Sequence, residues 1–461
     1  MSEKIWSGRF SKATESVMEQ YSYSLRFDQK LICDDIEVNK AWAEALVDVG
    51  VYTPEEAAQV VAALDSILQD FQSGQLEFSP LDEDIHSANE RWLTGRLGDL
   101  GARIHTGRSR NDQVVTDLRL YVRRWLQQLS AAVFDVQNAL LELARRHVVT
   151  VMPGYTHLRQ AQPLSFAHYV LALFFQLQRD DDRIKQAGQR CNVMPLGAGA
   201  LAGAAFAIDR VKLAIRLGFD APSENSIDAT SDRDLYCEVT YICAQIMIHL
   251  SRIAEDFIIW SSEGCRFIGI DDAYATGSSM MPQKKNPDSL ELIRGKTARV
   301  IGDQMTLMTL MKGIPTAYVR DLQEDKEALF DSLEQTLMSL QVFEGVIRTL
   351  QVHTETMRSA LDPMLYATDM ADFLVRKGMP FRKAHSVVGQ AVRFCEEHGI
   401  ALSAVPLAEL QKLSPLFDAS VKDLFDPISS INKRNLYGGT GVDSVRQQLE
   451  QAQQWLDRRS R

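Results

Sequence analysis

Long stretches of helical hydrophobic spacing dominate this chain. Between Gly107 and Pro153 there is neither glycine nor proline, the residues that most often end helices. Apolar residues recur in this interval at three- and four-residue steps, at positions 118, 121, 122, 125, 126, 129 and 133, which predicts one long amphipathic helix. Long helices are also expected between positions 222 and 264, between 287 and 313, and between 315 and 345.

Helices of this length exceed the average of ~11 to 12 residues in globular proteins, so they need equally long partners to bury their apolar stripes. Alternating strand patterns are nearly absent. We therefore expect an all-α fold with an elongated bundle of long helices in a central domain, flanked by smaller helical N- and C-terminal domains.

Helix start signals and the distribution of helix-breaking prolines and glycines predict the domain boundaries. Thr53-Pro54-Glu55-Glu56 has capping-box spacing and opens a shorter helix in the N-terminal part. Ser109 with Asp112 marks the start of the first long helix. Past Ala360, prolines and glycines become frequent again. The expected domains are 1–107, 108–360 and 361–461.

Composition narrows the class of protein. The 461 residues are 45% hydrophobic and 24% charged, as in ordinary globular proteins, and the net charge of -11 argues against a nucleic-acid partner. No apolar run is long enough for a secretory signal or a membrane span, so we expect a cytoplasmic protein without a membrane partner. The six cysteines form no CxxC pair, which argues against a zinc site or a disulfide framework.

The segment GSSMMPQKKNP, residues 277–287, is the first candidate for chemistry. It combines two hydroxyls, two adjacent lysines and an asparagine directly before a predicted helix N-terminus. A solvated, capped turn has a similar composition. However, positive side chains, amide donors and a helix N-terminus at one place also bind carboxylates and stabilise a serine alkoxide or an enolate-like intermediate.

Three other segments carry polar groups near expected helix ends. GYTHLRQAQP, from Gly154, places His157 among polar neighbours, where an imidazole exchanges protons near neutral pH. HTGRSRNDQ, from His105, puts two arginines at a helix start, where the helix dipole disfavours cations unless an anion is nearby. AYVRDLQEDKEALF, from Ala317, reads by itself as a solvated helix start with paired charges.

The serine loop resembles the signature loop of the fumarase and aspartase superfamily, whose members break C–N or C–O bonds by β-elimination and release fumarate. The QKKNPD continuation, HTGRSRNDQ, GYTH and DLQEDKE together resemble the argininosuccinate lyases within it. The resemblance extends through SGRF at Ser7, SLRFD at Ser24, DEDIH at Asp82 and SDRD at Ser231. These motifs run through most of the chain.

The resemblance implies the reversible conversion of argininosuccinate to arginine and fumarate through an aci-carboxylate intermediate, in arginine biosynthesis, with no cofactor and no metal. It implies a homotetramer whose active sites are shared between subunits. The catalytic residues it implies are His157, Ser278 and Glu291, with Glu291 polarising His157, and Asp84 and His86 near the site. The substrate-binding residues it implies are Ser24, Arg110, Asn111, Thr156, Lys284, Asn286, Tyr318, Gln323 and Lys326.

Two departures from the family pattern and several alternatives stay open at this stage. The chain reads Leu158-Arg159-Gln160 where Leu-Gln-Arg is common, and Met280 replaces a leucine or isoleucine. Which of Ser278 and His157 is the base and which the acid is not decided. The alternative functions are a sister fumarate-releasing lyase and a non-catalytic, crystallin-like structural relative; the lysine pair and the retained His157 and Ser278 argue against them.

Overall fold

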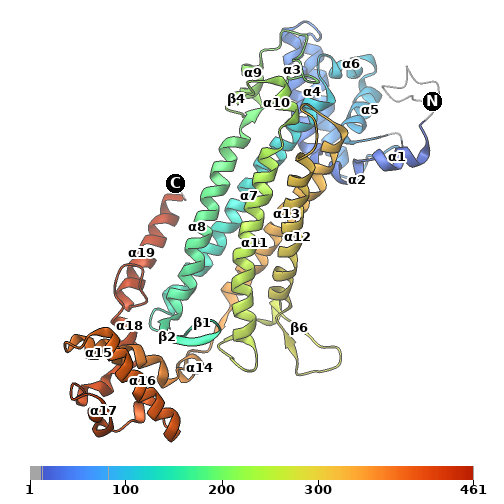
Figure 1. Ribbon diagram of the computed structural model, residues 1–461. Helices are drawn as coiled ribbons and strands as arrows, with labels where there is room; N and C mark the ends of the chain where they lie inside the picture. Colours follow the sequence, from blue (N-terminus) through green and yellow to red (C-terminus); the bar gives the residue numbers. More distant parts are fainter. Residues whose placement is uncertain (1–11, 13, 81, 460–461) are drawn as a thin grey trace. The chain divides into compact units, whose positions relative to one another are not determined.

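The computed structural model describes residues 12, 14–80 and 82–459. The motif at Ser7 lies outside these residues. The chain is mostly helical, as predicted. Five long helices are its main elements: α7 (Arg110–Arg146), α8 (Phe166–Cys191), α11 (Asp234–Ser261), α12 (Asp288–Met311) and α13 (Asp325–Thr349) (Figure 1). None of the described helices combines the length and hydrophobicity needed to span a bilayer.

By its internal contacts the chain divides into two compact units, each made of three stretches. The first unit comprises 1–130, 182–245 and 298–337, and the second comprises 131–181, 246–297 and 338–461. Each of the five long helices is divided, with one part in the first unit and the other part in the second.

Short elements complete the first unit. Its helices are α1 (Ser16–Ser22), α2 (Leu25–Asp28), α3 (Ile32–Asp48), α4 (Pro54–Gln72), α5 (Ile85–Leu97), α6 (Asp99–Ala102), α9 (Arg210–Arg216) and α10 (Ser226–Ser231). Single 3-10 turns lie at Gln29–Leu31, Arg103–His105 and Arg320–Glu324, and strands β3 (Val193–Met194) and β4 (Ala221–Pro222) pair in parallel.

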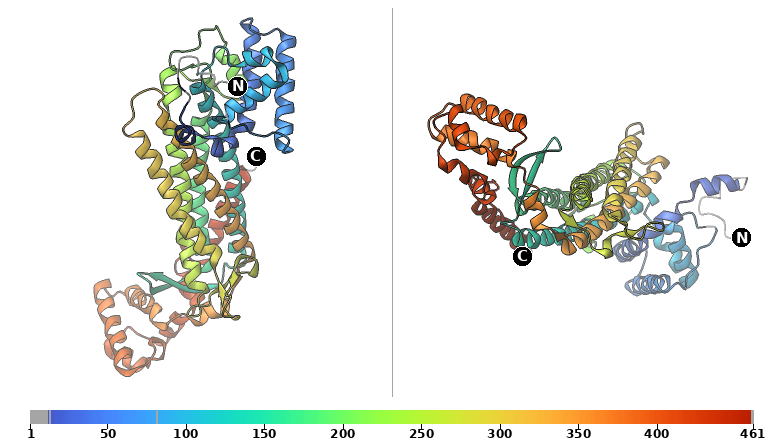
Figure 2. Two further views of the ribbon diagram at one scale, coloured as in Figure 1. Left: turned by 90° about the vertical axis from the view of Figure 1, so that its right-hand side faces the viewer. Right: turned by 90° about the horizontal axis from the view of Figure 1, so that it is seen from below.

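Local sequence signals explain where the helices of the first unit begin. Thr53 and Glu56 form the predicted capping box at the start of α4. At the start of α7, the Asp112 carboxylate accepts the N–H of Ser109, as the sequence suggested. Helices α3, α4 and α5 pack side by side, as both views show (Figures 1 and 2). Tyr121 of α7 packs on Phe330 of α13, with 4.5 Å between ring centroids.

The second unit contains the remaining elements. Its helices are α14 (Thr354–Ser359), α15 (Ala367–Arg376), α16 (Phe381–His398), α17 (Leu407–Leu413), α18 (Pro427–Asn432) and α19 (Val442–Arg459), and its 3-10 turns lie at Asp272–Tyr274, Pro363–Tyr366, Leu402–Ala404 and Ala419–Phe425. Its strands are β1 (Val151–Thr156), β2 (Arg159–Ser165), β5 (Ile268–Gly269), β6 (Thr276–Gly277), β7 (Lys285–Asn286) and β8 (Gln351–Val352), paired antiparallel as β1–β2, β5–β8 and β6–β7.

Contacts within the second unit hold the long helices together. The Gln137 side chain of α7 donates to the Phe174 carbonyl of α8 at 3.3 Å, and Thr297 of α12 donates to the Met247 carbonyl of α11 at 3.1 Å. The segment after residue 361 has a core of its own, built from residues on α15, α16 and α17 and the turns after them, among them Phe417. Helices α15 and α16 lie side by side there (Figure 2).

The predicted stripe on α7 is buried as the spacing requires. Leu118, Val122, Leu129 and Val133 are completely buried, and Trp125 alone is half-buried. The strand pairs were not predicted. The longest of them, β1–β2, replaces the simple helix junction expected around His157, because the segment pairs with itself across a two-residue turn.

Candidate active site

The serine loop is a hairpin between β6 and β7 that leads directly into α12. Thr276 pairs with Asn286 and Gly277 with Lys285, and Thr276 also hydrogen-bonds to Asp288 at the start of α12. The loop residues 278–284 therefore project from a short, closed base. This geometry fixes where the loop begins and ends while leaving most of its side chains exposed.

Ser278 is the better placed of the two loop serines. Ser278 is half-buried, and its Oγ accepts hydrogen bonds from the backbone N–H groups of Met280 at 3.3 Å and Met281 at 3.0 Å. Ser279 is exposed, and its hydroxyl has no hydrogen-bond partner among the described residues. Two amide donors on one serine oxygen stabilise negative charge on that oxygen. The arrangement therefore distinguishes Ser278 chemically from its neighbour.

The two lysines of the loop also differ. Lys285 forms an ion pair with Asp272, with 2.6 Å between Nζ and Oδ1. Lys284 is exposed and has no ion-pair partner among the residues that the structure describes. Its charge is therefore not neutralised by a described carboxylate, and the substrate-binding role of Lys284 stays a prediction.

His157 and Leu158 form the two-residue turn of the β1–β2 hairpin, between the paired residues Thr156 and Arg159. Both turn residues have positive φ, 54° for His157 and 58° for Leu158. Two-residue hairpin turns of this type favour asparagine and glycine, since other side chains are strained there. Strain of this kind is typical of functional segments. The His157 side chain is exposed, and its imidazole has no hydrogen-bond partner among the described residues.

The departure at Arg159-Gln160 has a structural use. The Gln160 amide donates to the Ala360 carbonyl at 3.0 Å and accepts the N–H of Asp362 at 3.3 Å, which ties the hairpin to the segment before α15. Arg159, at the start of β2, is exposed. The exchange therefore places the amide of Gln160 in a structural contact and leaves the Arg159 side chain exposed.

A second group of the predicted residues lies in the first unit, around Asp28. The buried Ser24 hydroxyl donates to Asp28 at 2.6 Å, and the N–H of Ile85 donates to the same carboxylate at 3.1 Å. Burial, and next the charge of Asp84, raise the pKa of Asp28, while the nearby Lys326 lowers it. Asp28 thus binds Ser24 directly and interacts with the charge of Lys326, although the sequence did not single it out.

The start of α7 holds Arg110 and Asn111 in place. Arg110 lies 3.6 Å from the Asp84 carboxylate, and the Asn111 amide donates to the Ala200 carbonyl at 3.2 Å. Burial raises the pKa of Asp84, but Arg110, His86 and the N–H of Ser87 outweigh it and hold the pKa below its ordinary value. The ionised Asp84 therefore compensates the cation that the helix dipole disfavours.

The remaining predicted residues precede and begin α13. Gln323 donates to the Ser22 carbonyl at 3.3 Å, and Tyr318 is half-buried. Lys326 is buried and donates to Asp325 at 3.2 Å. Asp325 in turn forms a completely buried ion pair with Arg233 of the SDRD motif, at 2.5 Å. No role was predicted for Arg233, which lies between α10 and α11, or for Asp325, the first residue of α13.

The predicted site thus divides between the two units. The first unit contains Ser24, Arg110, Asn111, Tyr318, Gln323 and Lys326. The second unit contains Thr156, His157, Ser278, Lys284, Asn286 and Glu291. Among the described residues, no hydrogen bond joins His157 to Glu291 or to Ser278. Glu291 is exposed in the first turn of α12. The polarisation of His157 by Glu291 accordingly stays a prediction.

Comparison with known proteins defines the class first. Residues 8–302 match the family described as lyase. Among solved structures, EDDS lyase in complex with formate superposes with a TM-score of 0.85 at 28% identity, over 97% of this chain and 91% of that one. The 3-carboxy-cis,cis-muconate lactonizing enzyme from Pseudomonas putida shares the fold, with a TM-score of 0.75 at 18% identity, over 97% of this chain and all of that one. The fold and the family match are those of a lyase.

More specific similarity covers nearly the whole chain. Residues 364–432 match the argininosuccinate lyase C-terminal family. Argininosuccinate lyase from Bacillus subtilis (strain 168) is 48% identical over 451 residues, and that from Geobacillus sp. (strain WCH70) is 47% identical over 451 residues; each match covers 98% of both chains. The chain belongs to the argininosuccinate lyase family, whose members are carbon–nitrogen lyases.

Proposed function

We propose that this protein catalyses the reversible β-elimination of argininosuccinate to arginine and fumarate, a step of arginine biosynthesis, and acts in the cytoplasm. The observation that carries the proposal is the environment of Ser278, where two backbone N–H groups meet one serine oxygen beside the exposed Lys284. Relatives 47% and 48% identical over almost their full length carry the name of this activity. An EDDS lyase variant similar in structure to this chain is described with bound fumarate.

The chemistry assigns the base role to Ser278. The carbon next to a carboxylate is a weak acid, so its base must be strong, and its dianionic intermediate needs donors and positive charge. The amides of Met280 and Met281 stabilise a Ser278 alkoxide, which takes the proton from that carbon. The C–N bond then breaks, and His157 supplies a proton to the departing guanidinium nitrogen. Lys284 and Asn286 stabilise the aci-carboxylate, and Thr156 binds substrate from the hairpin.

We propose further that the active sites are shared in a homotetramer. Asn111 lies in the first turn of α7, and His157 follows the end of the same helix. A helix of 37 residues is about 55 Å long, much longer than the substrate. A site in which one copy supplies Asn111 and another supplies His157 satisfies both assignments.

An exposed apolar stripe on α12 supports association between copies. Ile301, Met305 and Met308 are 38%, 57% and 52% exposed, and they follow one another at helical steps of four and three residues. Stripes of this kind are covered by another helix in stable oligomers. A second copy of the chain is the partner that the shared-site arrangement requires.

The function is tested by following fumarate absorbance after mixing the protein with argininosuccinate, with adenylosuccinate and aspartate as controls. Ser278→Ala and His157→Asn should each lower kcat by on the order of 10²- to 10⁴-fold, the usual worth of a positioned acid or base. Ser279→Ala and Lys285→Met are the matched controls and should stay within about threefold of wild type. Fumarate release from adenylosuccinate or aspartate but not from argininosuccinate would reassign the substrate.

We propose that Ser278 and His157 of one site also come from different copies, and this is tested by dissociating and reassembling the Ser278→Ala and His157→Asn proteins together. Partial activity should return in the mixture, whereas either variant reassembled alone should stay inactive. Mixed tetramers that form without any recovery would contradict shared sites.

A further inference from the structure

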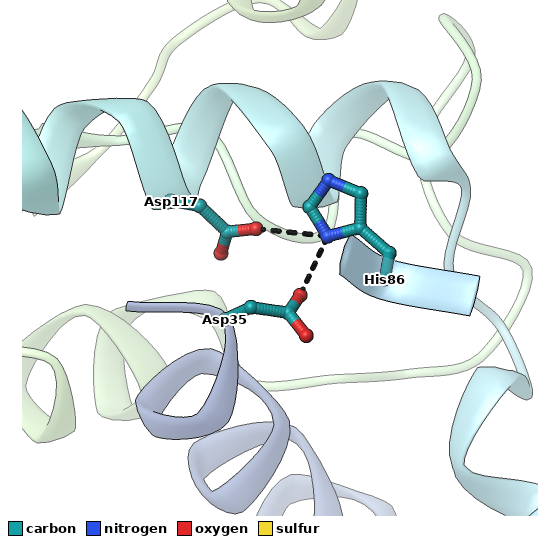
Figure 3. A group of neighbouring side chains, drawn as sticks. All are labelled: Asp35, His86 and Asp117. Atoms are coloured by element: carbon teal, nitrogen blue, oxygen red, sulfur yellow. Dashed lines mark hydrogen bonds and ion pairs between the residues drawn. The ribbon is translucent and has the colours of Figure 1, made fainter. Parts of the chain in front are cut away.

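A buried polar cluster that the proposed chemistry does not use lies in the first unit. It consists of Asp35 of α3, His86 of α5 and Asp117 of α7 (Figure 3). His86 is 3% exposed and the two aspartates are completely buried. The imidazole Nδ1 faces both carboxylates, at 2.7 Å from Asp35 and 3.3 Å from Asp117. A buried group of this kind is costly to desolvate, so its retention requires an explanation.

The donors around Asp35 argue against a metal site. One carboxylate oxygen accepts from His86 and Gln113, and the other accepts from Asn39 and Asn89, at 2.9 and 2.5 Å respectively. An ionised carboxylate has about four acceptor positions. All four are in use, so none is left for a cation. The cluster is a hydrogen-bonded network centred on Asp35.

The charge state of the cluster follows from its surroundings. Burial raises the pKa of Asp35, but His86, Arg108 and the Asn89 hydrogen bond outweigh it and lower the pKa well below its ordinary value. For Asp117, burial and the neighbouring Asp35 raise the pKa well above its ordinary value. Asp35 is therefore the anion of the network, and Asp117 is the carboxyl that holds its proton more tightly.

The network leads from Asp35 to a residue assigned above to substrate binding. The Gln113 amide N–H group donates to Asp35, and its carbonyl oxygen lies 3.5 Å from the Arg110 guanidinium. Because an ionised carboxylate only accepts hydrogen bonds, Asp35 fixes the orientation of the Gln113 amide and turns its oxygen toward Arg110. The buried Arg108, just before α7, donates to Asn39 of the same network at 2.7 Å.

We infer that Asp35 and Gln113 are positioning residues, which hold the first turn of α7 so that Arg110 and Asn111 meet the substrate. The inference rests on the proposed function, since it concerns the binding of argininosuccinate. Asp35 and Gln113 are buried, and we place them behind Arg110 and Asn111 rather than in contact with the substrate. Their effect is expected on KM, because Ser278 and His157 are unchanged.

The test compares Asp35→Asn with Asp34→Asn, a neighbouring buried aspartate on α3 that pairs instead with Arg124 at 2.5 Å. Asp35→Asn should raise KM for argininosuccinate at least tenfold with kcat within about threefold, while Asp34→Asn leaves both unchanged. Asp117→Asn should keep KM within about twofold, since among the described residues no hydrogen bond joins Asp117 to Gln113 or Arg110 and the amide keeps the shape of the carboxyl. A purely structural role for Asp35 would instead lower the active fraction, and so the apparent kcat, at constant KM.

Gln113→Leu keeps the test decisive if Asp35→Asn fails to fold. It removes the link to Arg110 but leaves Asp35 with three donors, so KM should again rise at least tenfold. Wild-type KM in folded Gln113→Leu, measured alongside a raised KM in Asn111→Ala, overturns the inference and leaves the proposed function intact. An unchanged KM in both Asn111→Ala and Arg110→Ala would instead show that the substrate-binding assignment itself is wrong.

Discussion

The completely buried ion pair between Arg233 and Asp325 provides the sharpest test of how the first unit is held together. Both side chains are 0% exposed; the guanidinium also donates to the carbonyls of Thr230 and Asp232 and lies over the Tyr236 ring, 5.6 Å from its centroid. Burial by itself would lower the pKa of Arg233, but Asp325 and its neighbours outweigh burial and raise this pKa above its ordinary value. The guanidinium therefore stays charged. Asp325→Ala therefore leaves a charged group in the interior without its counterion.

Removing one partner of a buried pair costs about 3 to 5 kcal/mol. At a urea slope of about 3 kcal/mol per M, this corresponds to a denaturation midpoint lower by roughly 1 to 1.7 M. The matched control is Glu327→Ala on the same helix, because Glu327 pairs with Arg26 while both are about half exposed or more, at 48% and 65%. Exposed pairs contribute about 0.2 to 1 kcal/mol, or at most about 0.3 M.

The assay is urea denaturation followed by far-ultraviolet circular dichroism. All proteins are compared at one concentration, since subunit association adds to the measured stability. Equal midpoints for Asp325→Ala and Glu327→Ala would refute the reasoning, because they would mean that Arg233 finds water or another anion once Asp325 is gone.

Two further predictions concern charge and backbone strain. Burial and the charge of the neighbouring Asp331 raise the pKa of Asp303 from 3.8 to about 7. The folded state therefore binds this proton more tightly than the unfolded state, and stability falls as pH rises from about 4 to 7. Asp303→Asn should flatten that dependence and raise the urea midpoint at pH 8, and parallel pH curves for variant and wild type would contradict it. At the hairpin turn, Leu158→Gly relieves the strain of φ 58°, whereas Leu158→Ile introduces a β-branched side chain there. In thermal unfolding the glycine variant should be more stable than the isoleucine variant by about 1 to 2 kcal/mol. Equal stabilities would argue against a left-handed turn.

Helical periodicity predicted most of the fold. The stripe from Leu118 to Val133, the capping box at Thr53 and the helix start at Ser109 all depend on interactions between residues close in the chain, and each is found as expected. The β1–β2 hairpin was missed because its turn residues, His157 and Leu158, are not those that favour positive φ. Sequence propensity is overridden there by the pairing of the two strands.

Family motifs pointed to the candidate site residues but not to the buried charged residues that hold them in place. Ser278 was chosen over Ser279; its Oγ accepts two backbone N–H groups, and its catalytic role stays a prediction. No role was assigned from the sequence to four buried charged residues: Asp28, Asp35, Arg233 and Asp325. Buried charges are stabilised by partners distant in sequence, as Arg233 is by Asp325. Such partners become apparent only once the helices are packed.

The division of each unit into three stretches has a consequence for biosynthesis. The first unit includes residues 298–337, and the second begins with 131–181 and ends with the last residues of the chain. A nascent chain therefore cannot complete the first unit until Leu337 has left the ribosome, well after the α3 to α5 region has emerged. Until then the apolar faces of α7 and α11 lack their α13 partner, so the growing polypeptide needs protection from aggregation for most of its synthesis.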